Sequence, residues 1–313
     1  MKKIILDCDP GHDDAVAIMF AAASSEIDLL GITCVAGNTT LNNATLNALK
    51  ICSFINKTNI NIYAGCNSPI KRKLVTADHV HGKSGLDYEG EDINIQKGYK
   101  IQKEHAVDFI IEQCKKSKEK IYLCPTGPLT NIARALTKYP QIANNIEKII
   151  FMGGAAKTIG NITPSAEFNI FVDPTAANIV LKSKIPIVMM GLDVTHKVLV
   201  DENVIKDFLS IGNKTSYFFK DLMNFYSKFH KQKYNTNSSP LHDPCVIGYL
   251  LNNDLFDLKF LNVIVEEESE LTMGKTIVDW LKVTNREANC YVADNVNVKE
   301  FFSLLKEKIS LLP

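Results

Sequence analysis

The sequence predicts a single α/β domain, residues 1–313, with an open, mostly parallel central sheet and helices on both faces. Short apolar runs of strand length alternate with longer amphipathic segments, which is the pattern of βαβ units. The chain has 313 residues, 46% hydrophobic and 22% charged, so it is long enough for one large domain. The sequence contains no repeat, low-complexity tract or linker-like stretch that would divide it.

The first strand and the turn after it are the most informative stretch. Residues 3–6 form a short apolar run that predicts a buried strand. Four aspartates follow within eight positions, around a Pro-Gly turn: Asp7, Asp9, Asp13 and Asp14. A helix is expected over residues 15–23, and its dipole favours negative charge in the first turn. Capping would need only one carboxylate, so the other acids require another explanation.

Strands and helices then alternate along the chain. Short runs rich in Val, Ile and Leu predict strands over residues 29–36, 60–64, 121–124, 149–152, 185–190, 260–265, 276–280 and 290–292. Apolar positions three and four apart predict helices over residues 41–55, 103–116, 129–136, 174–181, 201–209, 216–233, 244–251 and 298–305. Asp173-Pro174 and Asp243-Pro244 are typical helix starts, because aspartate caps a helix and proline suits its first position. Residues 65–100 are polar, and an irregular stretch of that length is usually functional or mobile.

Polar side chains follow several of the predicted strands. The aspartates come after the first strand, Asn38 after the second, Thr126 after a central strand and residues 152–169 after the next one. In a parallel sheet, ligands bind beyond the carboxyl ends of the strands. We therefore expect these side chains to meet at one edge of the sheet.

Four acids at the mouth of a buried strand repel one another unless a cation lies among them. Oxygen-only ligands suit Ca²⁺ or Mg²⁺ better than zinc. We predict a cage made by the carboxylates of Asp9, Asp14 and Asp243 and the backbone carbonyl of Thr126, with Ca²⁺ preferred because it tolerates about six to eight ligands. The simpler alternatives are a solvated, acid-rich turn and an ordinary N-cap at Asp243.

Three further groups of side chains suggest a polar ligand. Two amides and a carboxylate, spaced to hydrogen-bond several hydroxyls, lie in the loop from Gly160: Asn161, Glu167 and Asn169. His242 beside Asp243, and His81 in the polar stretch, are candidate proton donors because imidazole titrates near neutral pH. Three rings four positions apart share one helix face: Tyr226, His230 and Tyr234. The alternatives are a polar surface loop, a solvated His81 and a packed or solvated helix face.

The stretch Asp7-Cys8-Asp9-Pro10-Gly11-His12-Asp13-Asp14 resembles the D-x-D-P-G-x-D-D signature of the inosine–uridine preferring nucleoside hydrolases. Further blocks resemble that family in the same order over nearly the whole chain: Gly37-Asn38-Thr39, Val80-His81-Gly82, Pro125-Thr126-Gly127-Pro128-Leu129-Thr130-Asn131, Met152-Gly153-Gly154, Glu167-Phe168-Asn169, Leu241-His242-Asp243-Pro244 and Thr272-Met273-Gly274-Lys275-Thr276. The resemblance implies a nucleoside hydrolase-like fold with a Rossmann-like core. It also implies calcium-dependent hydrolysis of the N-glycosidic bond of ribonucleosides to ribose and free base.

The resemblance assigns a role to each candidate residue. Calcium ligands are Asp9, Asp14, Asp243 and the Thr126 carbonyl, with Asp9 also activating water. Ribose ligands are Asp13, Asn38, Asn161, Glu167 and Asn169, while Met152 and Phe168 line the sugar pocket. His81 and His242 assist the departing base. Family members vary in the helix that carries Tyr226, His230 and Tyr234, and from their shared face we expect these three rings to point at the base and set the base preference. The presence of both histidines resembles the subgroup acting on pyrimidine nucleosides, so we expect uridine and cytidine to be favoured, with inosine also a substrate.

Composition excludes other classes of partner. Lys+Arg and Asp+Glu are equal at 35 each, which argues against a nucleic-acid or anionic-membrane surface. No apolar run approaches the roughly 20 residues that span a bilayer. Eight scattered cysteines without a C-x-x-C pair, and a start without signal-peptide character, predict a reduced cytoplasmic protein. The family resemblance implies a homo-oligomer, either a dimer or a tetramer.

Two alternative functions remain at this point. A phosphohydrolase would use Asp7 or Asp9 as a nucleophile with Mg²⁺, but the Pro-Gly and paired acids do not suit that turn, and no glycine-rich phosphate cradle is present. A calcium-dependent ribonucleoside-binding protein without catalysis would be expected to lack Asp9 or His242, and the chain has both.

Overall fold

An eight-stranded sheet runs through the molecule in the order β3-β2-β1-β4-β5-β6-β12-β9. This computed structural model describes residues 1–313, except for the side chain of Tyr234. Neighbouring strands are parallel, apart from the edge strand β9, which is antiparallel to β12. The strands are β1 (Lys2–Cys8), β2 (Ile27–Cys34), β3 (Ile62–Ala64), β4 (Ile121–Pro125), β5 (Ile146–Met152), β6 (Ile187–Met190), β9 (Phe256–Leu261) and β12 (Cys290–Val296). The predicted mostly parallel sheet is confirmed.

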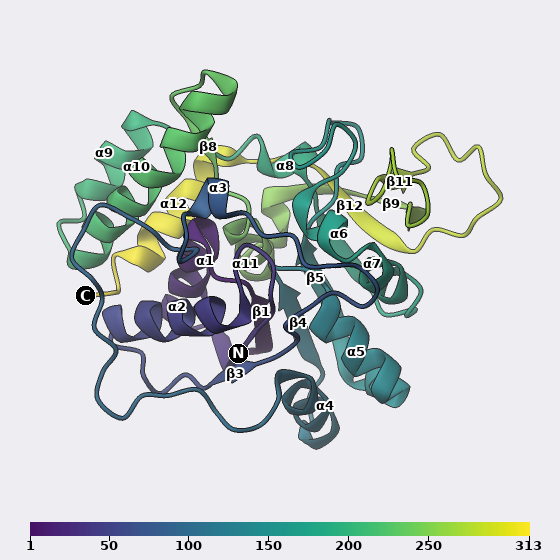
Figure 1. Ribbon diagram of the computed structural model, residues 1–313, viewed down its shortest axis with the longest axis horizontal. Coiled ribbons are helices and arrows are strands. Elements are labelled where there is room, and N and C mark those ends of the chain that lie inside the picture. Colours follow the sequence, from purple (N-terminus) through teal and green to yellow (C-terminus); the bar gives the residue numbers. More distant parts are fainter.

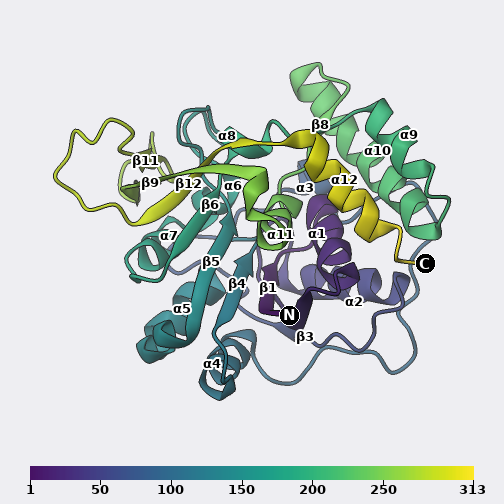
Figure 2. The same ribbon diagram turned by 180° about the vertical axis from the view of Figure 1, so that it is seen from behind.

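Helices cover both faces of the sheet, and each face has its own hydrophobic core (Figures 1 and 2). In β1, Ile4, Leu6 and Cys8 belong to one core and Ile5 to the other, as the two-residue period of a strand requires. The first face packs against α1 (His12–Ala23), α2 (Leu41–Phe54), α10 (Lys214–Tyr234), α11 (Pro244–Leu251) and α12 (Val298–Ile309). The second packs against α4 (Ala106–Lys116), α5 (Thr130–Lys138) and α7 (Pro174–Leu181).

Several short elements differ from the sequence prediction. The predicted strand over residues 260–265 is wrong, because β9 ends at Leu261 to pair with β12, whereas β10 (Val263–Val265) pairs with β11 (Thr276–Val278). A four-residue helix, α3 (Asp78–His81), interrupts the stretch expected to be irregular. The remaining elements are α6 (Phe168–Val172), α8 (Leu192–Thr195), β7 (Leu199–Val200), α9 (Glu202–Leu209), β8 (Ser239–Pro240) and the 3-10 helices η1 (Pro140–Asn145) and η2 (Asn253–Leu255).

Strands that follow β1 in the sequence lie on both sides of it in the sheet: β2 and β3 on one side, and β4, β5 and β6 on the other. The direction in which strands are added therefore reverses at β1. Such a switch point opens a crevice at the carboxyl ends of the strands. The backbone N–H of Thr126 donates to the Asp7 carbonyl at 2.8 Å, and that of Val35 donates to the Cys8 carbonyl at 3.0 Å. These bonds extend the pairing beyond the strands and bring three polar loops to the same edge.

Two predicted helix caps have different outcomes. The Asp173 carboxylate accepts the backbone N–H of Ala176 at 3.0 Å and caps α7. Asp243 occupies the N-cap position of α11, with Pro244 next to it, but its side chain makes no capping bond. The interpretation of Asp243 as an ordinary N-cap is therefore wrong, because its side chain does not cap the helix. The side chain lines a cavity instead.

The length and apolar character of the helices can be compared with what a membrane-spanning helix needs. Over the part of the chain that the structure describes, none of them combines the length and apolar character needed to cross a bilayer.

Candidate active site

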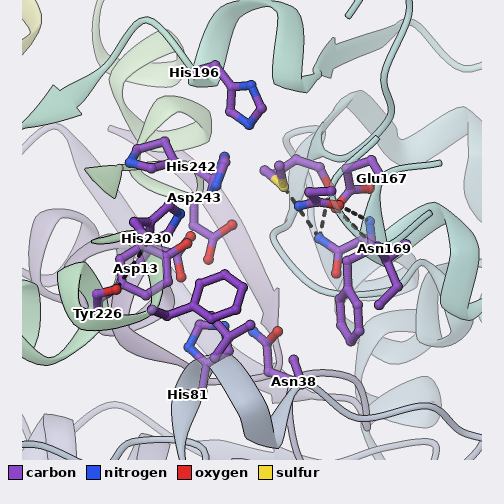
Figure 3. Close-up of a pocket in the computed structure, with 18 of the residues that line it drawn as sticks. Asp13, Asn38, His81, Glu167, Asn169, His196, Tyr226, His230, His242 and Asp243 are labelled. Carbon is purple, nitrogen blue, oxygen red and sulfur yellow. Dashed lines mark hydrogen bonds between the residues drawn. The ribbon is translucent and has the colours of Figure 1, made fainter. Parts of the chain in front are cut away.

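A cavity of about 450 Å³ lies where the predicted loops meet (Figure 3). Asp13 and Asp243 face its centre, with Glu167 and Asn169 on one wall and Tyr226, His230 and His242 on the opposite wall. Most of the sequence-predicted site residues line it: Asp13, Asn38, His81, Thr126, Met152, Asn161, Glu167, Phe168, Asn169, Tyr226, His230, His242 and Asp243. The prediction that strand-end loops converge at one edge is thus confirmed.

Three buried carboxylates form the acidic centre of the cavity. One oxygen from each of Asp13, Asp14 and Asp243 lies within 4.8 Å of the other two. Burial, followed by repulsion from Asp14, raises the pKa of Asp13 to about 7. Burial and the neighbouring aspartates also raise the pKa of Asp243 well above its usual range. Among the described residues that line the cavity, none is lysine or arginine, so no side-chain cation compensates these charges.

Asp14 is held by three donors. It accepts the backbone N–H of Gly11 at 3.0 Å, the side-chain amide of Asn38 at 3.1 Å and the hydroxyl of Thr126 at 2.7 Å. Gly11 precedes α1, and Asn38 and Thr126 follow β2 and β4, so all three loops at the switch point fix one carboxylate. Burial raises the pKa of Asp14 above its usual value, and the hydrogen bonds to both oxygens offset only part of that shift.

Asp9 lies beside this group with its carboxylate fully buried. Oδ2 accepts the backbone N–H of Asn38 at 2.5 Å, whereas Oδ1 has no hydrogen-bond partner within the described structure. Burial and the charges of Asp14 and Asp13 raise the pKa of Asp9 well above its usual range. A buried carboxylate oxygen without a partner is costly, and a bound cation would satisfy it.

The donor set fits a hard cation. The candidate ligands are carboxylate oxygens and the Thr126 carbonyl, which accepts the Asn169 amide at 2.6 Å and has a second lone pair. Oxygen-only sites with several carboxylates suit calcium or magnesium. The structure adds Asp13 to the acids expected here, because its carboxylate clusters with those of Asp14 and Asp243.

The opposite wall is built around the start of α6. Glu167 is buried and accepts the backbone N–H groups of Gly154, Asn169 and Ile170 at 2.9–3.2 Å. The Asn161 side-chain oxygen accepts the backbone N–H of Phe168 at 2.9 Å. These bonds fix the orientation of the polar groups that the sequence predicted as sugar ligands.

The histidines lie on the remaining walls. His81 and His242 are only 5% and 6% exposed, so the alternative in which His81 is simply solvated is wrong. Burial and neighbouring histidines lower both pKa values well below the usual range. His242 Nδ1 lies 2.7 Å from the Thr195 hydroxyl. Tyr226 and His230 line the cavity from α10, with ring centroids 4.7 Å apart; the side chain of Tyr234 lies outside the described residues.

Sequence reasoning missed three rings that also line the cavity: His79, His196 and Phe229. His196 could have been found, because it follows β6 by six positions and obeys the same strand-end rule. Phe229 lies between Tyr226 and His230 on α10, where the four-residue spacing did not include it. His79 belongs to α3, a four-residue helix in a stretch without a periodic apolar pattern.

The sequence profile of the family described as inosine-uridine preferring nucleoside hydrolase matches residues 4–303. This range includes every residue assigned to the site. The chain belongs to this family. The prediction of the family and of an enzyme is therefore confirmed, and the phosphohydrolase interpretation is excluded.

Individual members of this nucleoside hydrolase family resemble the chain along its whole length. A protein named pyrimidine-specific ribonucleoside hydrolase RihA, from Shewanella sp. (strain ANA-3), is 42% identical over 99% of this chain and 96% of its own length. One named pyrimidine-specific ribonucleoside hydrolase RihB, from Escherichia coli O9:H4, is 43% identical over 98% and 96%. The solved structure of a purine-preferring ribonucleoside hydrolase from Gardnerella vaginalis superposes with a TM-score of 0.90 at 34% identity, covering 99% and 98% of the two chains.

Proposed function

We propose that this protein is a calcium-dependent ribonucleoside hydrolase that cleaves the N-glycosidic bond to give ribose and free base. The observation that carries the proposal is the buried group of Asp13, Asp14 and Asp243, which faces a cavity without a lining lysine or arginine among the described residues. Membership of the nucleoside hydrolase family supports the reaction class. The volume of the cavity, about 450 Å³, falls in the range of small-molecule sites.

The cation would be held by Asp9, Asp14, Asp243 and the carbonyl of Thr126, with Asp13 beside them. When bound, calcium fixes the geometry of sugar hydroxyls and lowers the pKa of the attacking water. Burial and the neighbouring aspartates raise the pKa of Asp9, so a cation is needed to favour its charged form. This raised pKa and the unpartnered Oδ1 of Asp9 support the assignment. A hard oxygen-ligated ion is favoured because the donor set contains no nitrogen or sulfur.

Asp9, beside the bound cation, acts as the base that takes the proton of the attacking water. The sugar carbon becomes positively charged as the bond breaks, and Glu167, Asn161 and Asn169 stabilise that charge from the opposite wall. Asp13 and Asn38 bind ribose hydroxyls, and Met152 and Phe168 enclose the ring. No carboxylate forms a bond to the sugar, so the reaction inverts the anomeric carbon.

His242, together with His81, assists departure of the base by hydrogen bonding and proton transfer. Both line the cavity on the side of Tyr226 and His230, which we assign to base recognition with Tyr234. The names of the two bacterial relatives support a preference for pyrimidines such as uridine and cytidine. We also expect inosine, a purine nucleoside, to be a substrate, because a relative named purine-preferring ribonucleoside hydrolase shares the fold.

The proposal also covers the cellular compartment and the oligomeric state of the protein. The eight cysteines are all free, and seven of them are buried, which supports a reducing cytoplasm. We also propose a homo-oligomer, a dimer or a tetramer, which size-exclusion chromatography with light scattering would identify.

Reducing-sugar release from uridine, cytidine, inosine and adenosine, each with Ca²⁺ and with chelator, tests the function and ranks the bases. We expect calcium-dependent release, fastest from the pyrimidine nucleosides. A folded, calcium-loaded protein that binds these nucleosides and releases ribose from none would instead be a binding protein without catalysis.

The sugar contacts make a separate prediction. A calcium site that engages the 2′-hydroxyl should make 2′-deoxyuridine a poor substrate compared with uridine. Equal turnover of the two nucleosides would contradict that part of the proposal.

A further inference from the structure

His12, which directly precedes the paired aspartates Asp13 and Asp14, contacts the ring of His81. It is fully buried, and each of its ring nitrogens meets a different partner. Nε2 lies 2.7 Å from the backbone carbonyl oxygen of Asp87, and Nδ1 lies 3.0 Å from Nδ1 of His81. The two contacts connect the first turn of α1 to both ends of residues 81–87, which lie within the polar stretch 65–100.

The backbone carbonyl of Asp87 determines which ring nitrogen of His12 carries hydrogen. A carbonyl oxygen only accepts, so Nε2 of His12 must carry hydrogen. The ring stacks between Phe225, Tyr226 and His81, with centroids 5.1–5.7 Å apart. A charge there would be costly, so the ring is neutral and its Nδ1 is bare.

The bare nitrogen of His12 in turn determines the state of His81. Two bare nitrogens 3.0 Å apart would repel each other, so His81 must donate Nδ1–H to His12. The backbone N–H of His12 also points at His81 Nδ1, as a donor would to a bare nitrogen, but at 3.4 Å. The longer distance makes this the weaker contact, and it is the one given up when Nδ1 of His81 carries hydrogen. With Nδ1 engaged, Nε2 is the ring nitrogen that His81 has left for a ligand in the cavity it lines.

We propose that His12 is a positioning residue that holds His81 in the Nδ1–H tautomer and thereby reserves Nε2 for proton exchange with the departing base. The inference rests on the proposed function, because it assigns His81 to the leaving base. It adds a residue that does not touch the substrate.

The proposed proton transfer balances as follows. The bond between the sugar carbon and the base nitrogen breaks, and its electron pair stays with the base. His81 is neutral at rest, so Nε2 first takes a proton from solvent and then passes it to the base, while Nδ1–H stays on His12 and the ring becomes neutral again. Water forms the new bond to the sugar carbon and loses its proton to Asp9. Solvent then removes that proton from Asp9.

His242 provides an internal contrast. Its Nδ1 contacts the Thr195 hydroxyl at 2.7 Å, and a hydroxyl can both donate and accept. That contact leaves both tautomers of His242 open. The chain from Asp87 through His12 allows only one tautomer of His81.

Two substitutions separate hydrogen bonding from packing. His12→Phe keeps an aromatic ring in the stack but cannot accept a hydrogen bond. His12→Asn loses the ring but places an amide oxygen where Nδ1 was, so it can still accept from His81. The matched substrates are uridine, whose base benefits from a proton, and 4-nitrophenyl riboside, whose phenolate leaves without one.

We expect His12→Phe to lower kcat for uridine by about 10- to 100-fold, with little change in KM. This is less than the roughly 10²- to 10⁴-fold that a whole general acid contributes, because His81 itself remains. Turnover of 4-nitrophenyl riboside should stay close to that of the unmodified enzyme. His12→Asn should recover most of the uridine activity. Equal losses on both substrates, with no recovery by asparagine, would show a purely structural role and overturn the proposal.

Nitrogen-15 NMR of histidine-labelled, unmodified protein tests the tautomer without any variant at position 12. His81→Asn assigns the signals. We expect a protonated Nδ1 and a bare Nε2 at neutral pH, and the opposite pattern would overturn the inference. Absence of ribose release from every nucleoside would instead refute the proposed function, while the tautomer could still be read from the spectrum.

Discussion

The hydroxyl of Thr126 donates a 2.7 Å hydrogen bond to the carboxylate of Asp14, 112 positions earlier in the chain. The bond joins the loop after β4 to the first turn of α1, across the point where the strand order changes direction. Thr126 therefore has two roles in the proposed cation site. Its carbonyl is a candidate ligand, and its hydroxyl orients another one.

Thr126→Val tests the orienting role, because valine keeps the shape and the backbone carbonyl but removes the donor. We expect the affinity for Ca²⁺ to fall by about 10- to 100-fold, as for other groups that orient metal ligands. Isothermal titration calorimetry measures this loss. Thr126→Ser retains the hydroxyl and should bind almost normally; a serine variant as weak as the valine variant would refute the role of the hydrogen bond.

Gly37 and Asp9 are in close contact, which makes a second prediction. A Cβ atom at Gly37 would lie 2.1 Å from Oδ2 of Asp9. Gly37→Ala should therefore displace this carboxylate and lower kcat for uridine at least about tenfold, because small misplacements of catalytic groups are costly. Circular dichroism would verify folding. A folded alanine variant with normal kcat would show that the position of Asp9 is not critical.

Binding of Ca²⁺ should release protons near neutral pH. Burial raises the pKa of Asp13 to about 7 and that of Asp9 and Asp243 well above the usual value, so protons compete with the cation as the pH falls. We expect the affinity to drop between about pH 8 and about pH 6. Calorimetry in buffers with different ionisation enthalpies counts the protons, and Asp13→Asn should release fewer. Binding with no proton release would contradict these pKa directions.

The buried ring of His12 should make stability sensitive to acid. Burial lowers its native pKa to about 4 from an ordinary value of 6.5. Above 6.5 neither state is protonated, whereas between 6.5 and 4 the unfolded chain binds a proton that the native ring does not. The contribution to unfolding free energy is therefore lost as the pH falls, by up to about 3 kcal/mol.

Urea unfolding of the unmodified protein and His12→Phe across this pH window measures the effect, since other titrations cancel in the difference. The stability of the unmodified protein should decrease relative to the variant as the pH falls. A difference in unfolding free energy that does not vary with pH would show that His12 has an ordinary pKa.

The convergence of Asp14, Asn38 and Thr126 could be predicted because it depends only on topology. Each follows a parallel strand, and the carboxyl ends of such strands meet at one edge. The inclusion of Asp13 in the carboxylate group was harder to predict. It depends on where α1 begins, since a helix starting at His12 directs successive aspartates along different sides.

The contact between His12 and His81 could not be found from the sequence. Residues 65–100 have no hydrophobic period, so nothing places α3. Its position depends on tertiary bonds such as the one from the Ala77 backbone N–H to the Asn38 carbonyl at 2.9 Å. The division between β9 and β10 was missed for a similar reason, because it depends on which distant strand each one pairs with.

The central claim is that the buried aspartates hold the calcium needed for ribonucleoside hydrolysis. Ribose release from uridine, measured while Ca²⁺ is added back to chelator-treated protein, tests it most directly, with Asp14→Asn as the matched variant. We predict that calcium restores release in the unmodified protein and restores little in the variant. Release that survives complete chelation, or equal recovery in folded Asp14→Asn, would contradict the claim.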